Sequence, residues 1–338
     1  VPQFLPGVLA LGVLRPAAGP MTVELGSPLA ADALAGLWQD PPTLPVKWLY
    51  DERGSKLFDE ITRLPEYYPT RRETAILTAR AAEIAAVTQA EMMVELGSGT
   101  STKTRLLLDA FAAHWEKCTT RLRYVPVDVS NEILGTAAEI LSIDYPSVDV
   151  VPVVADFTEP DLPLPAASGP RVAVFLGGTI GNFYPEDRAR FYQRLAGSLS
   201  PGDYFLMGAD LVKDTGRLVA AYNDKAGVTA DFNRNMIEVL RTGLDARGLY
   251  ADDFDHIARW NPVDHRIEMW LRARRDVAAY FEVLQRPWRI SAGTEILTEI
   301  STKFDAADLA SELGDAGLPV VASWTDPAGD FLLVLSRR

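Results

Sequence analysis

The sequence predicts an α/β protein with a doubly wound parallel sheet and a second, inserted α+β subdomain. Apolar strand segments alternate with helical segments between residues 92 and 212. Such alternation implies right-handed βαβ crossovers, with helices on both faces of one sheet. The rhythm breaks after residue 212 and returns near residue 303, where a helix is followed by two strands joined by "PAGD". We therefore expect the sheet to end in an antiparallel hairpin.

Helical periodicity and short apolar runs locate the elements of the main sheet. Three helices are expected before the sheet, at 29–40, 54–63 and 73–89. The first strand, "MMVELG", is short, apolar and closed by a glycine. Counting from it, the five strands are expected at 92–97, 122–130, 148–157, 171–183 and 204–212.

The segment after residue 212 has a different organisation. Residues 215–244 are expected to be helical, and "FDHIARWNPVDHRIEMWLRARRD" and "YFEVLQRPWRISAGTEILTEIS" are typical of paired strands. A helix at 305–318 and the strands "PVVASWTD" and "FLLVLS" then complete the main sheet. Residues 1–27 are expected to be disordered or an upstream extension. The predicted units are a core of 28–71, 91–212 and 303–338, and a substrate-binding subdomain of 72–90 and 213–302.

Composition excludes several classes of function. The chain has 338 residues and a net charge of −13, with no dense run of Lys and Arg. A nucleic-acid partner is therefore not expected, and a small-molecule substrate fits better. The single cysteine, Cys118, suits a reducing cytoplasm, and no His or Cys spacing typical of a metal site is present. Residues 1–20 are too short and too often broken by Pro and Gly to span a membrane. We expect a cytoplasmic monomer without metal or membrane partners.

The glycine turn "VELGSGTSTKT" at 94–104 has three interpretations. A phosphate-binding loop needs a second glycine where this chain has Thr102, because the backbone wraps the phosphates closely. The dinucleotide fingerprint is broken at the same residue. The third interpretation, an S-adenosylmethionine (AdoMet) site, uses more of the sequence.

Acidic residues at the ends of the expected strands favour AdoMet. Gly97 lets the backbone pass close to the methionine moiety, and Asp128 can accept both ribose hydroxyls. Asp156 can bind the adenine amino group, and Phe157 can cover a face of the ring. These residues fall at carboxyl ends of parallel strands, where open sheets bind ligands. A sheet ending in a hairpin is also more typical of AdoMet methyltransferases than of dehydrogenases.

Longer motifs resemble one family, the histidine-specific, AdoMet-dependent α-amino methyltransferases of ergothioneine biosynthesis, which form hercynine. The specific segments are "KWLYDERGSKLFDEITRLPEYYPTRRE", "FLGGTIGN", "ADLVKDTGRLVAAYND", "VTADFNRN", "RIEMWLRAR", "LTEIS" and "WTDPAGDF". They run from about residue 45 to the last residues of the chain. The resemblance implies a class I, Rossmann-like fold, AdoMet as methyl donor and L-histidine as substrate. It places the cofactor on Tyr50, Gly97, Lys103, Asp128, Asp156 and Phe157, with Lys103 pairing with the methionine carboxylate.

The same resemblance places histidine on Tyr67, Asn182, Tyr222, Met269, Glu299 and Ser301. Asn182 would bridge the substrate amine and carboxylate, Tyr222 would bind the carboxylate, and Tyr67 would aim the amine. We expect Tyr67 and Asn182 to be the catalytic pair. Glu299 and Ser301 are alternate residues of one strand, so both can face the imidazole nitrogens.

Two alternatives stay open at this stage. One is the same chemistry on another aromatic amino acid, such as tryptophan, although Glu299 and Met269 favour an imidazole. The other is an AdoMet-binding module without catalytic activity.

Overall fold

The computed structural model describes residues 26–99, 103–115, 121–129, 131–157 and 164–338. The expectations for residues 1–25, and those that rest on Thr102 and Cys118, lie outside this part of the chain. No helix among the described residues is long and apolar enough to cross a membrane.

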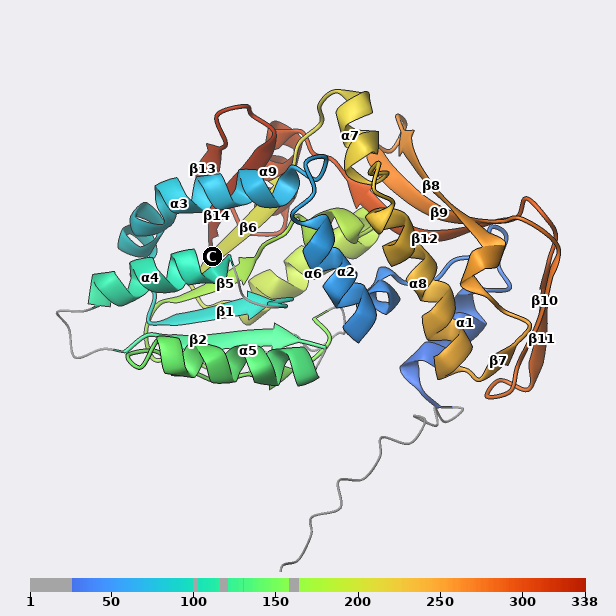
Figure 1. Cartoon of the computed structure of the whole chain (residues 1–338). Coiled ribbons are helices and arrows are strands. Elements are labelled where there is room, and N and C mark those ends of the chain that lie inside the picture. The colour runs from blue at the N-terminus through green and yellow to red at the C-terminus, as the bar shows by residue number, and fades with distance from the viewer. Residues whose placement is uncertain (1–25, 100–102, 116–120, 130, 158–163) are drawn as a thin grey trace, which may run out of the picture.

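The main sheet confirms the expected architecture (Figure 1). Its strands lie in the order β13-β14-β6-β5-β1-β2-β3, with β4 also paired to β2. The strands from β1 to β6 run parallel, whereas β14 is antiparallel to both β6 and β13 and so forms the predicted hairpin. The strands are β1 (Met92–Leu96), β2 (Arg123–Asp128), β3 (Asp149–Val150), β4 (Val153–Val154), β5 (Arg171–Phe175), β6 (Tyr204–Asp210), β13 (Val320–Thr325) and β14 (Phe331–Arg337).

Helices cover both faces of this sheet and bury its apolar side chains. One core joins the sheet to α3 (Pro69–Thr88), α4 (Thr104–Trp115) and α5 (Asn131–Asp144). A second core, on the other face, joins it to α6 (Pro185–Ser198) and α9 (Ala306–Asp315). The fold is therefore doubly wound, as the alternation of strands and helices predicted.

Three expected elements differ in detail. The strand expected at 148–157 is split into β3 and β4 on either side of Pro152, which has no N–H to donate to a ladder. The strand expected at 171–183 ends at Phe175, and a 3₁₀ turn, η2 (Thr179–Asn182), follows. The helix expected at 215–244 is two helices, α7 (Thr215–Ala221) and α8 (Val228–Gly243), because Gly227 is left-handed with φ of 80°.

The second unit contains two small antiparallel sheets, shown on the right of Figure 1. One is β11-β10-β7 and the other is β12-β9-β8. These strands are β7 (Ala246–Arg247), β8 (Phe254–Asn261), β9 (Arg266–Ala273), β10 (Val277–Phe281), β11 (Arg286–Ile290) and β12 (Glu295–Thr302). The helical elements packed with them are α1 (Pro28–Gly36), η1 (Val46–Leu49), α2 (Glu52–Ile61), α7, α8 and η3 (Ala251–Asp253).

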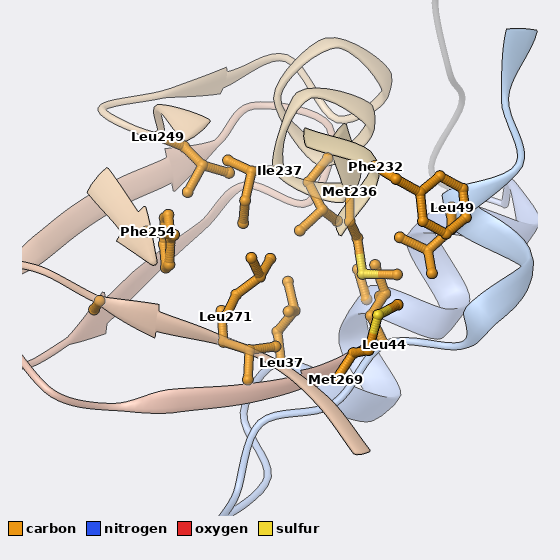
Figure 2. Close-up of a cluster of buried hydrophobic side chains, with 14 of the residues drawn as sticks. Leu37, Leu44, Leu49, Phe232, Met236, Ile237, Leu249, Phe254, Met269 and Leu271 are labelled. Carbon is orange, nitrogen blue, oxygen red and sulfur yellow. The ribbon is translucent and has the colours of Figure 1, made fainter. Parts of the chain in front are cut away.

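The packing corrects the expected division of the N-terminal residues. Leu37, Leu44 and Leu49 pack with Phe232 and Met269 in the core of the second unit (Figure 2). Residues 28–68 therefore belong to that unit, although they were expected in the sheet core. Helix α3, expected in the substrate-binding subdomain, packs on the main sheet instead. An amphipathic segment carries an apolar face but no signal for which core will cover it.

Two backbone contacts bring the units together beside the ends of the parallel strands. Phe304, just after β12, exchanges backbone hydrogen bonds with the end of β6 at Asp210 (2.8 Å) and Val212 (3.1 Å). Element η2 lies against β12, and a Cβ added at Gly181 would lie only 2.8 Å from the Thr302 carbonyl oxygen. Glycine at 181 thus permits the close approach that sets β12 over the main sheet.

We predict that Gly181→Ala destabilises the protein, because its methyl group would meet the backbone of β12. The expected loss in unfolding free energy is about 1–3 kcal/mol, measured by urea denaturation. The matched control is Gly197→Ala in α6, where nothing lies within 4 Å of the added Cβ. That change should be neutral or stabilising by up to about 1 kcal/mol. Equal unfolding free energies for the two variants would contradict the close-approach argument.

Candidate active site

The glycine turn lies at the carboxyl end of β1 and is anchored to β2. The N–H groups of Gly97 and Ser98 donate to the Val127 carbonyl at 2.8 and 3.2 Å, and the Gly99 N–H donates to Asp128 Oδ2 at 2.9 Å. Gly97 and Gly99 have φ of 68° and 50°, a region that favours glycine. The turn therefore exposes backbone beside a half-buried carboxylate, as a nucleoside-binding strand end requires.

Phe157 and Asp156 complete this side of the site. A Cβ added at Gly97 would lie 3.2 Å from the Phe157 ring, so the ring lies directly against the turn. The Asp156 carboxylate lies 3.4 Å from Lys47 Nζ, and Lys47 also pairs with Asp32 at 3.2 Å. Gly97, Asp128, Asp156 and Phe157 are therefore gathered at neighbouring strand ends, as expected. Lys47, in η1, was not expected there, although it begins the quoted segment "KWLYDERGSKLFDEITRLPEYYPTRRE".

Lys103 lies beside the same turn and is ion-paired with Glu73 of α3. Glu73 is fully buried and accepts the Gly177 N–H at 2.9 and 3.0 Å. It fits there because Gly208 on β6 has no side chain; a Cβ at that position would lie 2.1 Å from the Glu73 carboxylate. The pair holds the lysine between the glycine turn and the loop after β5. Glu73 was not predicted as a site residue, although it ends the quoted segment "LPEYYPTRRE".

The residues expected to bind the histidine substrate come together over the loop after β5. Glu299 and Ser301 lie on one face of β12, and Met269 lies opposite Glu299 on β9. The Asn182 amide donates to Glu299 Oε1 at 3.2 Å and to the Ile300 carbonyl at 2.6 Å. The Tyr222 hydroxyl lies 2.7 Å from Ser301 Oγ.

Two further tyrosines face this group. The rings of Tyr67 and Tyr222 lie edge to face at 6.1 Å. Tyr50 packs edge-on against Phe58 and Phe232, each at 5.4 Å. Burial raises the pKa of all three tyrosines well above the usual range, and the charge of Glu299 raises each further. Their hydroxyls therefore stay protonated. Tyr50 was expected to bind the cofactor, but it lies beside the residues expected to bind histidine.

The carboxyl group of Glu299 has a pKa near neutrality. Burial raises the pKa of its carboxyl to about 7, while the Asn182 hydrogen bond and the charge of Lys303 act in the opposite direction. Close to pH 7 this side chain can therefore accept a proton from an imidazole N–H or share one with the ring.

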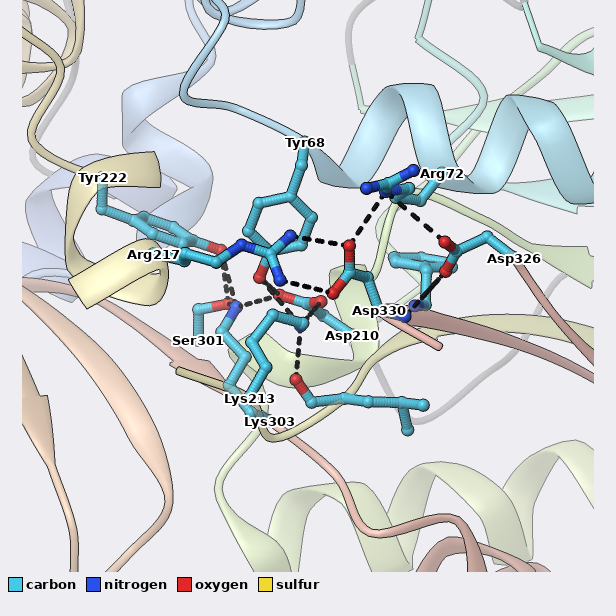
Figure 3. A network of polar contacts seen from close by, with 12 residues as sticks. Tyr68, Arg72, Asp210, Lys213, Arg217, Tyr222, Ser301, Lys303, Asp326 and Asp330 are labelled. Atoms are coloured by element: carbon cyan, nitrogen blue, oxygen red, sulfur yellow. Dashed lines mark hydrogen bonds and ion pairs between the residues drawn. The ribbon is translucent and has the colours of Figure 1, made fainter. Parts of the chain in front are cut away.

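A polar network around Asp210 and Lys303 was not predicted (Figure 3). Lys303 is 2 % exposed and donates to Tyr222 Oη at 2.9 Å and to Ser301 Oγ at 2.7 Å, and it pairs with Asp210 at 3.0 Å. Asp210 also accepts from the Tyr68 hydroxyl at 2.7 Å and from Lys213 at 2.5 Å. Asp210 and Lys213 belong to the quoted segment "ADLVKDTGRL", and Tyr68 to "LPEYYPTR", so the motifs contained them without revealing their contacts.

No cluster of three or more metal-ligating side chains occurs within the part of the chain that the structure describes. The site consists of a glycine turn with acidic strand ends, a lysine ion-paired with Glu73, and a cluster of polar side chains near the loop after β5. On a doubly wound sheet that ends in an antiparallel hairpin, these features define a class I, Rossmann-like AdoMet methyltransferase.

Comparison with known proteins identifies the family. The family model described as histidine-specific, SAM-dependent methyltransferase matches residues 29–338, and the chain belongs to this family. A histidine N-alpha-methyltransferase from Mycolicibacterium smegmatis is 48% identical over 94% of this chain and 100% of its own length. One from Mycobacterium tuberculosis is 48% identical over 92% of this chain and 95% of its length. Ergothioneine biosynthesis protein 1 from Neurospora crassa is 31% identical over 88% of this chain and 34% of its own.

We predict that Lys103→Met weakens AdoMet binding by roughly 10- to 100-fold, because the variant lacks the charge expected to contact the methionine carboxylate. Isothermal calorimetry would compare AdoMet with 5′-methylthioadenosine, which lacks that carboxylate. The variant should bind methylthioadenosine as the wild type does, which also reports that the fold is intact. An equal loss of affinity for both ligands would show that Lys103 does not contact the methionine carboxylate.

Proposed function

We propose that this protein transfers three methyl groups from AdoMet to the α-amino group of L-histidine and forms hercynine, a step of ergothioneine biosynthesis. The observation that carries the proposal is the polar pair Glu299 and Ser301 on one face of β12, held against Asn182 of the loop after β5. Membership of the histidine-specific family and the names of the two relatives at 48% identity support the same substrate.

The residues at the strand ends fit AdoMet. In the proposed arrangement Asp128 binds the ribose hydroxyls, Asp156 the adenine amino group, and Phe157 covers the adenine ring beside Gly97. Lys103, held by Glu73, is available to the methionine carboxylate. AdoMet, when bound, supplies an electrophilic methyl group on a sulfonium.

Two tyrosines and Asn182 orient the histidine substrate. Asn182 bridges the substrate amine and carboxylate, the Tyr222 hydroxyl binds the carboxylate, and the buried Tyr67 aims the amine. Because the high pKa of Tyr67 keeps its hydroxyl protonated, its oxygen can accept from the amine without competing for the proton as a base. Holding the lone pair in one direction removes most of the orientational cost of the displacement.

The amine must be neutral to attack, so the substrate ammonium first loses a proton. No strong base faces the expected position of the amine among the site residues described, and we propose that this proton passes to water. The same geometry serves the mono- and dimethyl amines. Transfer stops at the trimethyl stage, since a quaternary nitrogen has no lone pair.

Specificity for the imidazole is assigned to Glu299, Ser301 and Met269. A pocket with buried polar groups rejects ligands that leave those groups unpaired. Glu299 and Ser301 match the two imidazole nitrogens, and Met269, opposite Glu299 on β9, supplies an apolar surface. An indole ring has one N–H and would leave one of the two polar groups without a partner.

We also propose that the protein acts as a monomer in the cytoplasm. A single cysteine, which cannot form an internal disulfide, suits a reducing compartment.

The defining test is mass spectrometry of the product formed from histidine and AdoMet. We expect histidine to gain three methyl groups, and tryptophan in a parallel reaction to gain none or far fewer. Faster methylation of tryptophan would favour the alternative substrate. AdoMet binding without methylation of either amino acid would favour a non-catalytic module.

Glu299→Ala should weaken histidine binding by roughly 10- to 100-fold, because the imidazole loses a charged partner, and should leave AdoMet binding unchanged. The matched control is Glu295→Ala on the same strand, whose carboxylate pairs with Arg259 and Arg272 at the surface. Calorimetry should find near wild-type histidine affinity for that control. Unchanged histidine affinity in Glu299→Ala would remove this residue from the imidazole site.

A further inference from the structure

The ammonium group of Lys303 is placed to act on the substrate through two hydroxyls. It is one of the largest fully buried side chains of the protein, and all three of its N–H donors have partners: Tyr222 Oη, Ser301 Oγ and the Asp210 carboxylate. An ion in such a position is costly unless it is paired and hydrogen-bonded. The two hydroxyls that it contacts belong to the proposed carboxylate and imidazole sites.

The carboxylate that is ion-paired with Lys303 has other partners as well. Asp210 is shared with Lys213 and also accepts from Tyr68 (Figure 3). Lys303 and Lys213 therefore share the Asp210 carboxylate, so this carboxylate is not reserved for Lys303. The charge of Lys303 lies directly behind Tyr222 and Ser301, where it favours a negatively charged group of a ligand bound to those hydroxyls.

The hydrogen bonds of Lys303 fix how the two hydroxyls can donate. Each accepts a hydrogen bond from Lys303, and one of their two O–H groups is used in the 2.7 Å bond between them. One O–H group is left for the substrate. It is strengthened as a donor, because both oxygens accept from a cation. The charge of Lys303 also reaches Glu299, where it opposes the effect of burial on the carboxyl pKa.

We propose that Lys303 is a positioning and specificity residue that makes the site require a free α-carboxylate on its substrate. This inference rests on the proposed function and deepens it. Lys303 does not touch the reacting atoms; it acts through Tyr222 and Ser301. Histidinamide, which has the same imidazole and amine but no negative charge, should therefore be a poor ligand.

The first measurement uses the wild-type protein. Calorimetry in the presence of S-adenosylhomocysteine should find that histidine binds more tightly than histidinamide, by roughly tenfold or more, since the amide brings no negative charge to the hydroxyls in front of Lys303. Equal affinities for the two ligands would overturn the proposal, whether or not any variant folds. Failure to methylate histidine at all would instead overturn the proposed function.

The second measurement compares variants of Lys303 and Lys213. Lys303→Met and Lys303→Gln should lose roughly tenfold or more of the preference for histidine over histidinamide, whereas Lys303→Arg should keep most of it. Lys213→Met is the matched control: it removes the same charge from Asp210, but Lys213 contacts Asp210, Tyr68 and Leu211 rather than the two hydroxyls. It should retain the larger part of the preference. A purely structural role of Lys303 would weaken both ligands equally and leave the ratio unchanged, which would overturn the proposal.

Discussion

The buried contact between Lys303 and Asp210 joins the two halves of the site. Asp210 ends β6 of the main sheet, and Lys303 follows β12 of the second unit. Backbone hydrogen bonds of Phe304 with Asp210 and Val212 hold the same two segments in register. Because an unpaired buried charge is strongly destabilising, this ion pair constrains where β12 can lie relative to the carboxyl ends of the parallel strands. The places of Glu299 and Ser301, which lie on β12, follow from the position of that strand.

The cofactor half is organised by a different constraint, the absence of side chains. Positive φ at Gly97 and Gly99 forms the turn, and Phe157 lies against the bare backbone of Gly97. Gly208 makes room for the buried Glu73, which in turn tethers Lys103. In both halves a buried carboxylate therefore positions a lysine, Glu73 for Lys103 and Asp210 for Lys303. The protein's own carboxylates thus hold both lysines in place.

Sequence patterns were reliable wherever a local rule applied. The strands β1, β2, β5 and β6, the helices between them and the closing hairpin follow from periodicity and turn residues. Local rules failed where backbone chemistry interrupts a pattern, as at Pro152 and Gly227. They also failed for packing partners. Helix α3 and residues 28–68 were expected in the opposite units, because each apolar face is equally suited to either core.

The sequence by itself determined the class of fold, the family and most residues of the candidate site, because strand ends, glycine turns and long motifs are local features. The tertiary structure alone decided which side chains meet across the chain. Lys303 and Tyr222 are 81 positions apart, and Lys103 and Glu73 are 30 apart. No periodicity encodes such pairs, since a buried ion is stabilised by whichever opposite charge the folded chain brings to it. For that reason the contacts of Lys303 became visible only in the folded molecule.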